Sequence, residues 1–280
     1  MSCPISRILP LLLALVIMSG CNSTRQSDQE PILEPIATVA SNITPVDKAT
    51  PPLTDAPADA GDQLYDCATV TQIPIAECQA LVDFYQATNG PNWIEKGDWL
   101  TTDTPCNWYG LTCLDGHVES LAIFFNDLQG PLPVALADLS QLRLLDLHNN
   151  RISGPIPAEI GQLANLELLE LSWNRLDGSI PAELAALSQL QRLSLTDNHL
   201  SGPIPAELGQ LADLRYLELS RNQLDGPIPE ALADLLVLEA IRLSDNQLEG
   251  IIPFGLGQLP SLGEVDLSFN QLTGSVPSAL

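Results

Sequence analysis

The sequence is dominated by a 24-residue period. An asparagine recurs at this spacing without a slip, at Asn126, Asn150, Asn174, Asn198, Asn222, Asn246 and Asn270. Around each of them the frame LxxLxLxxNxLxGxIPxxLxxLxx repeats, with Val, Ile or Phe replacing Leu at some positions. Repeats of this length bury their apolar face only against their neighbours. The chain is therefore expected to stack into a solenoid.

The spacing inside one repeat predicts its local structure. Leu169 and Leu171 flank Glu170, which indicates a short strand with two inward side chains, and stacked copies would form a parallel sheet. The amide of Asn174 can bond to backbone groups of adjacent turns. Gly178 permits a backbone conformation that a Cβ resists, and Pro181 favours an extended entry to the opposite side. The repeated Asn, Gly and Pro are thus structural residues.

The frame resembles that of the leucine-rich repeat family, and "NxLxGxIP" resembles its plant-type subclass. "CNWYGLTC", residues 106–113, is similar to the N-terminal cap of those proteins, in which the paired cysteines are bridged. Over about residues 75–280, the resemblance implies an α/β repeat solenoid: a curved horseshoe segment with a concave parallel β-sheet and a second short strand near "GPIP". It also implies a small helical, disulfide-stapled N-terminal cap and a role in recognition.

Four segments follow from these patterns: a signal peptide (1–20), a tether (21–62), the cap (63–117) and seven repeats (118–280), the last one incomplete. Arg7, the apolar run over residues 8–18 and the small residues before Cys21 resemble a bacterial lipoprotein signal with Cys21 as the lipidated residue. We therefore expect an exported chain, held by a lipid anchor alone in the cell envelope, with secretion as the alternative. Asn22 after the anchor implies the bacterial outer membrane in such lipoproteins. Residues 22–62, rich in Pro, Thr, Ala and Asp, predict a flexible tether.

The cap region contains four further cysteines, Cys67, Cys78, Cys106 and Cys113. Export favours two disulfides, and although three pairings are possible, the spacings favour Cys67–Cys78 and Cys106–Cys113. A zinc site is the alternative, but the region has no CxxC knuckle. Pro74 and Asn89 mark the ends of an expected helix. Trp93, Trp99 and Trp108 indicate heavy packing of this cap, the alternative being a carbohydrate platform.

The charge and the motifs exclude several functions. With 35 Asp and Glu against 11 Lys and Arg, the formal charge is −24, which disfavours nucleic acid as a partner. The sequence contains no GxSxG, HExxH or phosphate-loop motif. We expect no enzymatic activity, no cofactor and no metal.

Candidate binding residues occupy the positions that flank the buried leucines and change from repeat to repeat. We expect the concave face to bind a protein, peptide or glycan through Leu144, Asp146, His148, Leu168, Glu170, Trp173, Arg192, Tyr216, Glu218, Arg221 and Arg242. Trp173 and Tyr216 are the candidate anchors. Phe124 and Phe125 are expected to cover the sheet beside the cap. The serines that recur two residues before the repeated asparagines are interpreted as small, solvated strand residues.

Asp146 and Glu170 should be neighbours on adjacent strands, about 5 Å apart. A catalytic dyad or a calcium site would need a pocket or more oxygen ligands, so a solvated acidic face that favours basic or polar partners is the preferred interpretation. The alternative function is a structural or adhesive envelope protein that assembles by solenoid stacking. Because the seventh repeat stops at Leu280, self-association at that end, fraying and a longer natural chain all remain open.

Overall fold

The computed structural model describes residues 65–278 and residue 280. The expected signal peptide, lipidation site and tether lie outside these residues, so they stay predictions. Among the described residues, no helix has both the length and the apolar character that a membrane span requires.

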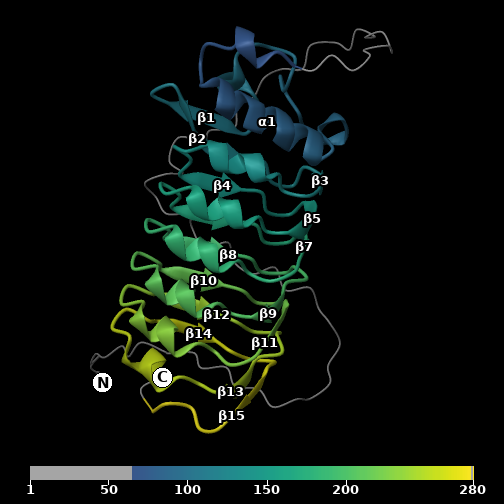
Figure 1. Cartoon of the computed structure of the whole chain (residues 1–280). Coiled ribbons are helices and arrows are strands. Elements are labelled where there is room, and N and C mark those ends of the chain that lie inside the picture. Colours follow the sequence, from purple (N-terminus) through teal and green to yellow (C-terminus); the bar gives the residue numbers. More distant parts are fainter. Residues whose placement is uncertain (1–64, 279) are drawn as a thin grey trace, which may run out of the picture. The chain divides into compact units, whose positions relative to one another are not determined.

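One turn of chain stacks on the next in sequence order, as Figure 1 shows. The main sheet has eight strands: β1 (Leu111–Leu114), β2 (His117–Ala122), β4 (Leu144–Asp146), β6 (Leu168–Glu170), β8 (Arg192–Ser194), β10 (Tyr216–Glu218), β12 (Ala240–Arg242) and β14 (Glu264–Asp266). All neighbours from β2 onward are parallel, whereas β1 pairs antiparallel with β2. The parallel sheet confirms the prediction from the period. The antiparallel edge strand β1 belongs to the cap and was not predicted.

Short second strands follow each asparagine, as the plant-type frame implies. They form one group of three, β3 (Gln129–Gly130), β5 (Arg151–Pro155) and β7 (Arg175–Asp177), and two pairs, β9 (Ser201–Pro203) with β11 (Gln223–Asp225) and β13 (Glu249–Ile251) with β15 (Gln271–Thr273). Gly178, which follows β7, has a φ of 76°, a conformation that a Cβ would strain. The frame glycine has a positive φ in every repeat; it follows the second strand at Gly178, Gly226 and Gly274 and lies within it at Gly154, Gly202 and Gly250.

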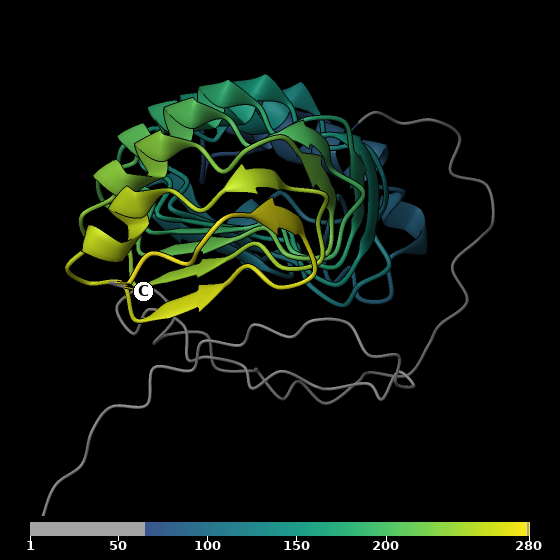
Figure 2. The ribbon, with the colours of Figure 1, turned by 90° about the horizontal axis from the view of Figure 1, so that it is seen from below.

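Short 3-10 helices lie on the side opposite the main sheet, as the view along the stack shows (Figure 2). They are η4 (Val134–Asp138), η5 (Ala158–Gln162), η6 (Ala182–Ala186), η7 (Ala206–Gln210), η8 (Glu230–Asp234) and η9 (Phe254–Gln258). Each begins after a proline, as η6 does after Pro181, which has φ −66° and ψ 131°. The proline fixes an extended entry, and the few residues before the next leucine leave room for only a short helix.

The core is a set of leucine columns that run between the sheet and the helices. Leu169, Leu171, Leu184 and Leu187 of one repeat are all fully buried. Asn174 completes the core by donating to the carbonyls of Leu147 (3.0 Å) and Leu171 (3.1 Å) and accepting from the Ile152 N–H (3.0 Å). The same ladder recurs at the later asparagines, which confirms their structural role.

The cap covers the first turn of the stack. Its α-helix, α1 (Ile75–Ala87), begins after Pro74, and the disulfides join Cys67 to Cys78 and Cys106 to Cys113, the pairing that the spacings favoured. The rings of the three cap tryptophans are buried and lie 5.0–5.1 Å apart in sequence order: Trp93, Trp99 and Trp108. Burial confirms packing and contradicts a carbohydrate platform, because these rings have no free face.

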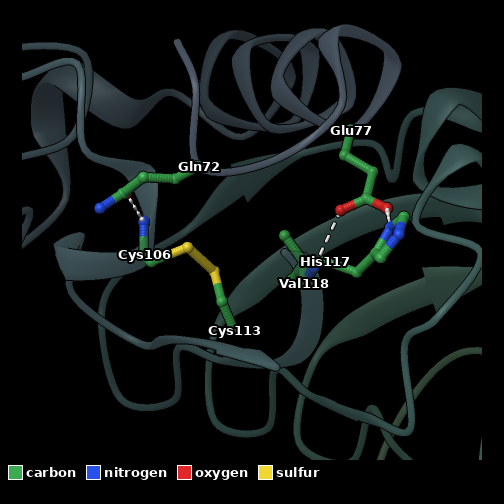
Figure 3. The surroundings of a disulfide bond; sticks show 6 residues. All are labelled: Gln72, Glu77, Cys106, Cys113, His117 and Val118. Atoms are coloured by element: carbon green, nitrogen blue, oxygen red, sulfur yellow. Dashed lines mark hydrogen bonds and ion pairs between the residues drawn. A yellow bond between two sulfur atoms is a disulfide. The ribbon is translucent and has the colours of Figure 1, made fainter. Parts of the chain in front are cut away.

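Polar contacts join the cap helix α1 to strand β2. Glu77 of α1 bonds to the His117 ring (2.6 Å) and accepts from the Val118 N–H (2.8 Å), close to the Cys106–Cys113 disulfide (Figure 3). Gly130 lies at the other end of α1, where a Cβ would meet the Ala87 carbonyl oxygen at 2.1 Å. The helix is therefore held at both ends against the stack.

Candidate functional site

The candidate site is the outer surface of the main sheet, called here the concave face. Register brings the second variable position of each repeat into one column: Ala122, Asp146, Glu170, Ser194, Glu218, Arg242 and Asp266. Neighbours in such a column lie about 4.8 Å apart, so their side chains interact directly. The charge pattern of the concave face therefore depends on the residues in this column.

An aromatic group occupies the end nearest the cap. Phe124 stacks on His148 with ring centroids 4.9 Å apart and 12° between the planes, and Phe125 meets the same ring edge-on at 5.2 Å. His148 also bonds to Asp146 (2.6 Å). Burial lowers the pKa of His148, but the hydrogen bond to Asp146 and the charges of Asp146 and Glu170 outweigh it, so the pKa is raised.

Glu170 lies next along the column. Burial raises the pKa of its carboxyl, the charges of Asp146 and Glu218 raise it further, and hydrogen bonding to Ser172 partly opposes them. Its Oε1 accepts the Ser172 N–H at 3.0 Å. In the described part of the chain, no ion pair joins Asp146 or Glu170 to an arginine or lysine. This part of the face is therefore acidic and incompletely neutralised.

The later repeats carry a chain of alternating charges. Arg192 pairs with Glu218 (3.2 Å), Arg242 pairs with the other oxygen of Glu218, and Arg242 also reaches Glu264 (2.7 Å). The Glu218 residue is only 7% exposed, so the two arginines compensate a buried carboxylate. The concave face is thus electrically uneven: acidic toward the cap and largely neutralised beyond it.

Tyr216 is held by two neighbours. Its hydroxyl donates to Glu239 (2.7 Å), and the Arg192 guanidinium lies over its ring at 4.4 Å. The bond to Glu239 and burial raise the pKa of Tyr216, while the bonds from Tyr216 and Arg215 lower the pKa of Glu239. Tyr216 is therefore a fixed, half-buried part of the face.

A row of left-handed residues borders the concave face. The residue before each asparagine has a φ between 52° and 58°, and these seven residues are Phe125, Asn149, Trp173, Asp197, Arg221, Asp245 and Phe269. We call them the αL row. Backbone bonds between neighbours, such as Trp173 N–H to Thr196 O at 2.8 Å, extend the ladder of the sheet into this row. The sequence predicted outward strand positions here, whereas the strands end before them.

Three expectations about exposure are wrong. Leu144 is only 6% exposed, because Ser120 and Leu168 flank it in one in-register column and the short side chains cover one another. Three of the serines are buried rather than solvated, and Ser268 is half-buried: Ser172 bonds to Ser194 (2.7 Å), and Ser244 bonds to Ser220 (3.0 Å). Glu218 is buried, so the acidic line is not uniformly solvated. Leu168, Arg192 and Arg242 are half-buried, and Trp173 and Arg221 are exposed.

The sequence analysis did not single out the column of residues that stands one position before the first variable position of each repeat. Arg143 lies between Glu119 (3.0 Å) and Glu167, and Arg215 contacts Glu239. The missed signal was a charge that alternates in sign at steps of 24 residues. These pairs form a second charged edge of the concave face.

The described residues show no cluster of three or more His, Cys, Asp or Glu side chains that could hold a metal ion. The residues of the concave face that are described above form aromatic, acidic and ion-paired zones.

A parallel-sheet solenoid with this cap defines a leucine-rich repeat module. The chain belongs to the leucine-rich repeat family. It matches one family model, "Leucine rich repeat", over residues 116–176, and a second, "Leucine Rich Repeat", over 189–211, 213–235, 237–259 and 261–280. It also matches "Leucine rich repeat N-terminal domain" over residues 75–114.

Similar solved structures are plant proteins or receptor ectodomains. A pollen receptor kinase 3 structure is 38% identical, with 70% of this chain and 95% of that chain covered and a TM-score of 0.60. A plant ice-binding protein is 31% identical, with 74% and 67% covered and a TM-score of 0.67. The plant peptide hormone receptor RGFR1 in complex with RGF2 is 32% identical, with 55% and 28% covered and a TM-score of 0.52.

Among curated proteins, the chain resembles the LRR receptor-like serine/threonine-protein kinase FEI 2 of Arabidopsis thaliana, with 49% identity over 57 residues. That match covers 19% of this chain and 10% of the relative. The chain spans at most 18% of the length of such relatives. The likeness therefore concerns the repeat module and not the whole receptors.

Proposed function

We propose that this chain is a non-enzymatic recognition module that binds a protein or peptide partner through its concave face. One observation carries the proposal: the buried frame is nearly constant, whereas the accessible positions on one continuous sheet change at every repeat. Packing alone requires only the frame. A surface that varies on a constant scaffold is typical of recognition.

The charge pattern favours a partner with a basic group. Asp146 and Glu170 carry no arginine or lysine partner in the part of the chain that the structure describes, and Phe124 and His148 form an aromatic wall beside them. A cationic side chain could pair with the carboxylates and pack on the rings. The later repeats would help to orient the partner but would not attract it by charge, because Arg192 and Arg242 already neutralise Glu218.

The comparisons support a peptide or protein as the partner. RGFR1 is a peptide hormone receptor seen in complex with RGF2, and it shares this fold at 32% identity. A glycan remains an alternative ligand on this face. Assembly by solenoid stacking remains the alternative function, and size-exclusion chromatography separates the two, since a concentration-dependent increase in size would favour assembly.

The test is capture of binding partners by the full chain, compared with the double variant Asp146→Asn/Glu170→Gln. Both substitutions keep the side-chain shape and remove charge, so partner recovery should fall about tenfold or more while folding persists. The control is Glu183→Gln on η6, an exposed carboxylate on the opposite side. Equal recovery with all three proteins would refute concave-face recognition.

We also propose that the chain is exported and anchored to the cell envelope, in a bacterial outer membrane, through a lipid on Cys21. The apolar run over residues 8–18 and the small residues before Cys21 support this proposal. In a bacterial expression host, Cys21→Ser should abolish incorporation of labelled palmitate and release the protein from the membrane fraction. Unchanged membrane association of that variant would exclude the anchor.

A further inference from the structure

Arginines and carboxylates alternate from turn to turn along the concave face. Among the described residues of this face and its borders, three arginines each bridge two carboxylates, one on the preceding turn and one on the following turn. These bridges are Glu119–Arg143–Glu167, Asp197–Arg221–Asp245 and Glu218–Arg242–Glu264. An arginine on the intervening turn is thus the means by which this face holds two nearby carboxylates.

Asp146 and Glu170, called here the carboxylate pair, depart from this arrangement. They occupy partnered positions on the adjacent strands β4 and β6, so no turn of the chain lies between them. The arginine on the next turn, Arg192, pairs instead with Glu218 at 3.2 Å and lies over the Tyr216 ring at 4.4 Å. In the part of the chain that the structure describes, no ion pair joins the carboxylate pair to an arginine. A guanidinium that bridges the pair would therefore have to come from another molecule.

Glu170 is the less satisfied of the two carboxylates. Asp146 bonds to the His148 ring at 2.6 Å. Glu170 is half-buried and accepts the Ser172 N–H at 3.0 Å, and the residue beside it on the following strand is the uncharged Ser194. A carboxylate that is partly withdrawn from water gains strongly from a charged donor, because burial has already removed part of its hydration.

The concave face contains its own example of how it holds a guanidinium. Arg192 combines a carboxylate, that of Glu218, with the face of an aromatic ring, that of Tyr216. The carboxylate pair lies beside the same two kinds of group, since its His148 partner stacks on Phe124 with ring centroids 4.9 Å apart. Phe124 remains 39% exposed. The acidic and aromatic components thus recur nearer the cap without an arginine of the chain.

We propose that the carboxylate pair binds an arginine side chain of the partner, with the Phe124 ring beside the guanidinium. Column neighbours lie about 4.8 Å apart, a distance that one planar guanidinium spans when it donates to both carboxylates. A lysine ammonium is a compact, strongly hydrated charge that matches the two acceptors and the ring less well. This inference rests on the proposed recognition function and specifies the side chain that the acidic zone recognises.

Arginine binding should strengthen as the pH rises. The groups around Glu170 are Asp146 and His148 from β4 and the turn after it, Ser172 after β6, Arg192 and Ser194 on β8, and Glu218 on β10. Burial, and then the charges of Asp146 and Glu218, raise the pKa of Glu170, and a protonated carboxyl forms no ion pair. Burial lowers the pKa of His148, but the bond to Asp146 and the nearby carboxylate charges raise it overall. Rising pH therefore adds a negative charge and removes a positive charge beside the guanidinium.

The probe is N-acetyl-arginine amide, titrated into the full chain and followed by NMR on the ring signals of His148. The chain has three histidines, so the signal that disappears in His148→Gln identifies the ring beside the carboxylate pair. The probe should shift this signal in a saturable manner, and N-acetyl-lysine amide should bind at least about fivefold more weakly. Arginine binding should be about threefold or more tighter at about pH 8 than at about pH 5.

Variants test whether the arginine lies on the carboxylate pair. Glu170→Gln keeps the side-chain shape, and it should weaken arginine binding about fivefold or more and reduce its pH dependence. The matched control is Glu183→Gln, which removes an exposed carboxylate on η6, on the opposite side, and should bind like the wild type. Phe124→Leu should reduce the preference for arginine over lysine, because it removes the ring and leaves the charges. Cooperative thermal melts check that each variant is folded.

Three results would overturn the inference: no saturable shift of the His148 signal, equal binding of the arginine and lysine amides, or arginine binding that Glu170→Gln leaves unchanged. Failure of the proposed function is distinguishable. If Asp146→Asn/Glu170→Gln loses a captured partner while the arginine amide gives no shift, concave-face recognition stands and the arginine inference is wrong. If the arginine amide binds through Glu170 but no captured partner depends on the pair, the arginine site stands and recognition of a protein or peptide there is wrong.

Discussion

Asp146 of β4 and Glu170 of β6 face each other in register on adjacent parallel strands. The first carboxylate binds His148, and the second accepts a backbone N–H from Ser172. This like-charge pair on a partly buried surface destabilises the folded state locally, and it leaves an acidic position that a partner can complete.

Glu170→Gln should stabilise the chain near neutral pH. The folded-state pKa of Glu170 is raised by burial first and then by neighbouring charge, so the protonated form is favoured in the fold and ionisation is unfavourable. The wild type therefore loses stability as pH rises from the unfolded value near ~4.3 through the folded pKa. The variant should gain up to about 1 kcal/mol at neutral pH and nothing at about pH 4 or below. Thermal melts across this range would show it, and a gain that persists unchanged in acid would contradict it.

His148 should show the opposite pH dependence. Although burial lowers its pKa, the bond to Asp146 and the nearby carboxylate charges raise it overall, so the protonated ring is favoured in the fold. Its stabilisation is full below the unfolded value near ~6.5 and is lost as pH rises through the folded pKa. His148→Gln should therefore lower the melting temperature more in mild acid than in alkali. In NMR titrations Asp146→Asn should reduce the pKa of His148, and an unchanged pKa would remove Asp146 as its cause.

Asn174→Ala should break the polar ladder between three turns. The variant leaves the Ile152 N–H without its acceptor, whereas the carbonyls of Leu147 and Leu171 each lose one donor but keep the amides of Asn150 and Asn198. A buried group left unpaired costs about 1–3 kcal/mol, so a loss of about 2–3 kcal/mol is expected in denaturant unfolding. Asn165→Ala is the control, because Asn165 also bonds to the preceding repeat, through Ser140 O at 3.0 Å, but this bond is exposed to solvent. Similar losses of unfolding free energy for the two variants would show that the buried asparagine bonds stabilise the fold no more than an exposed bond between repeats does.

The cap disulfides should contribute to stability in the order of their loop lengths. Cys67–Cys78 and Cys106–Cys113 close sequence separations of 11 and 7 residues. Loop-closure entropy gives about 2–3 kcal/mol for each, with slightly more for the first. Paired Cys→Ser variants of each bridge, melted without reductant, measure the two contributions. Melting temperatures that match the wild type would show that the cap packs independently of its bridges.

Sequence reasoning succeeded where contacts repeat. The alternation around Leu169 and Leu171 located the strand, and the recurring Asn174 position located the ladder. It failed at Leu144 and at Ser172, Ser220 and Ser244, which share the phase of accessible residues but are covered by neighbours in the adjacent turns. It also placed Trp173 on a strand, although the chain has already turned into left-handed φ at that residue.

The sequence by itself determined the stack, its cap and its polar ladder, because each buried leucine and asparagine meets its counterpart one period away, and a local pattern therefore specifies a tertiary contact. Only the tertiary structure decided the binding surface. Whether Glu218 is neutralised depends on the reach of Arg192 and Arg242 across strands, and whether Trp173 is exposed depends on a backbone turn and on Arg221 two repeats later. These contacts join residues whose identities differ from repeat to repeat, so the 24-residue period of the sequence does not specify them.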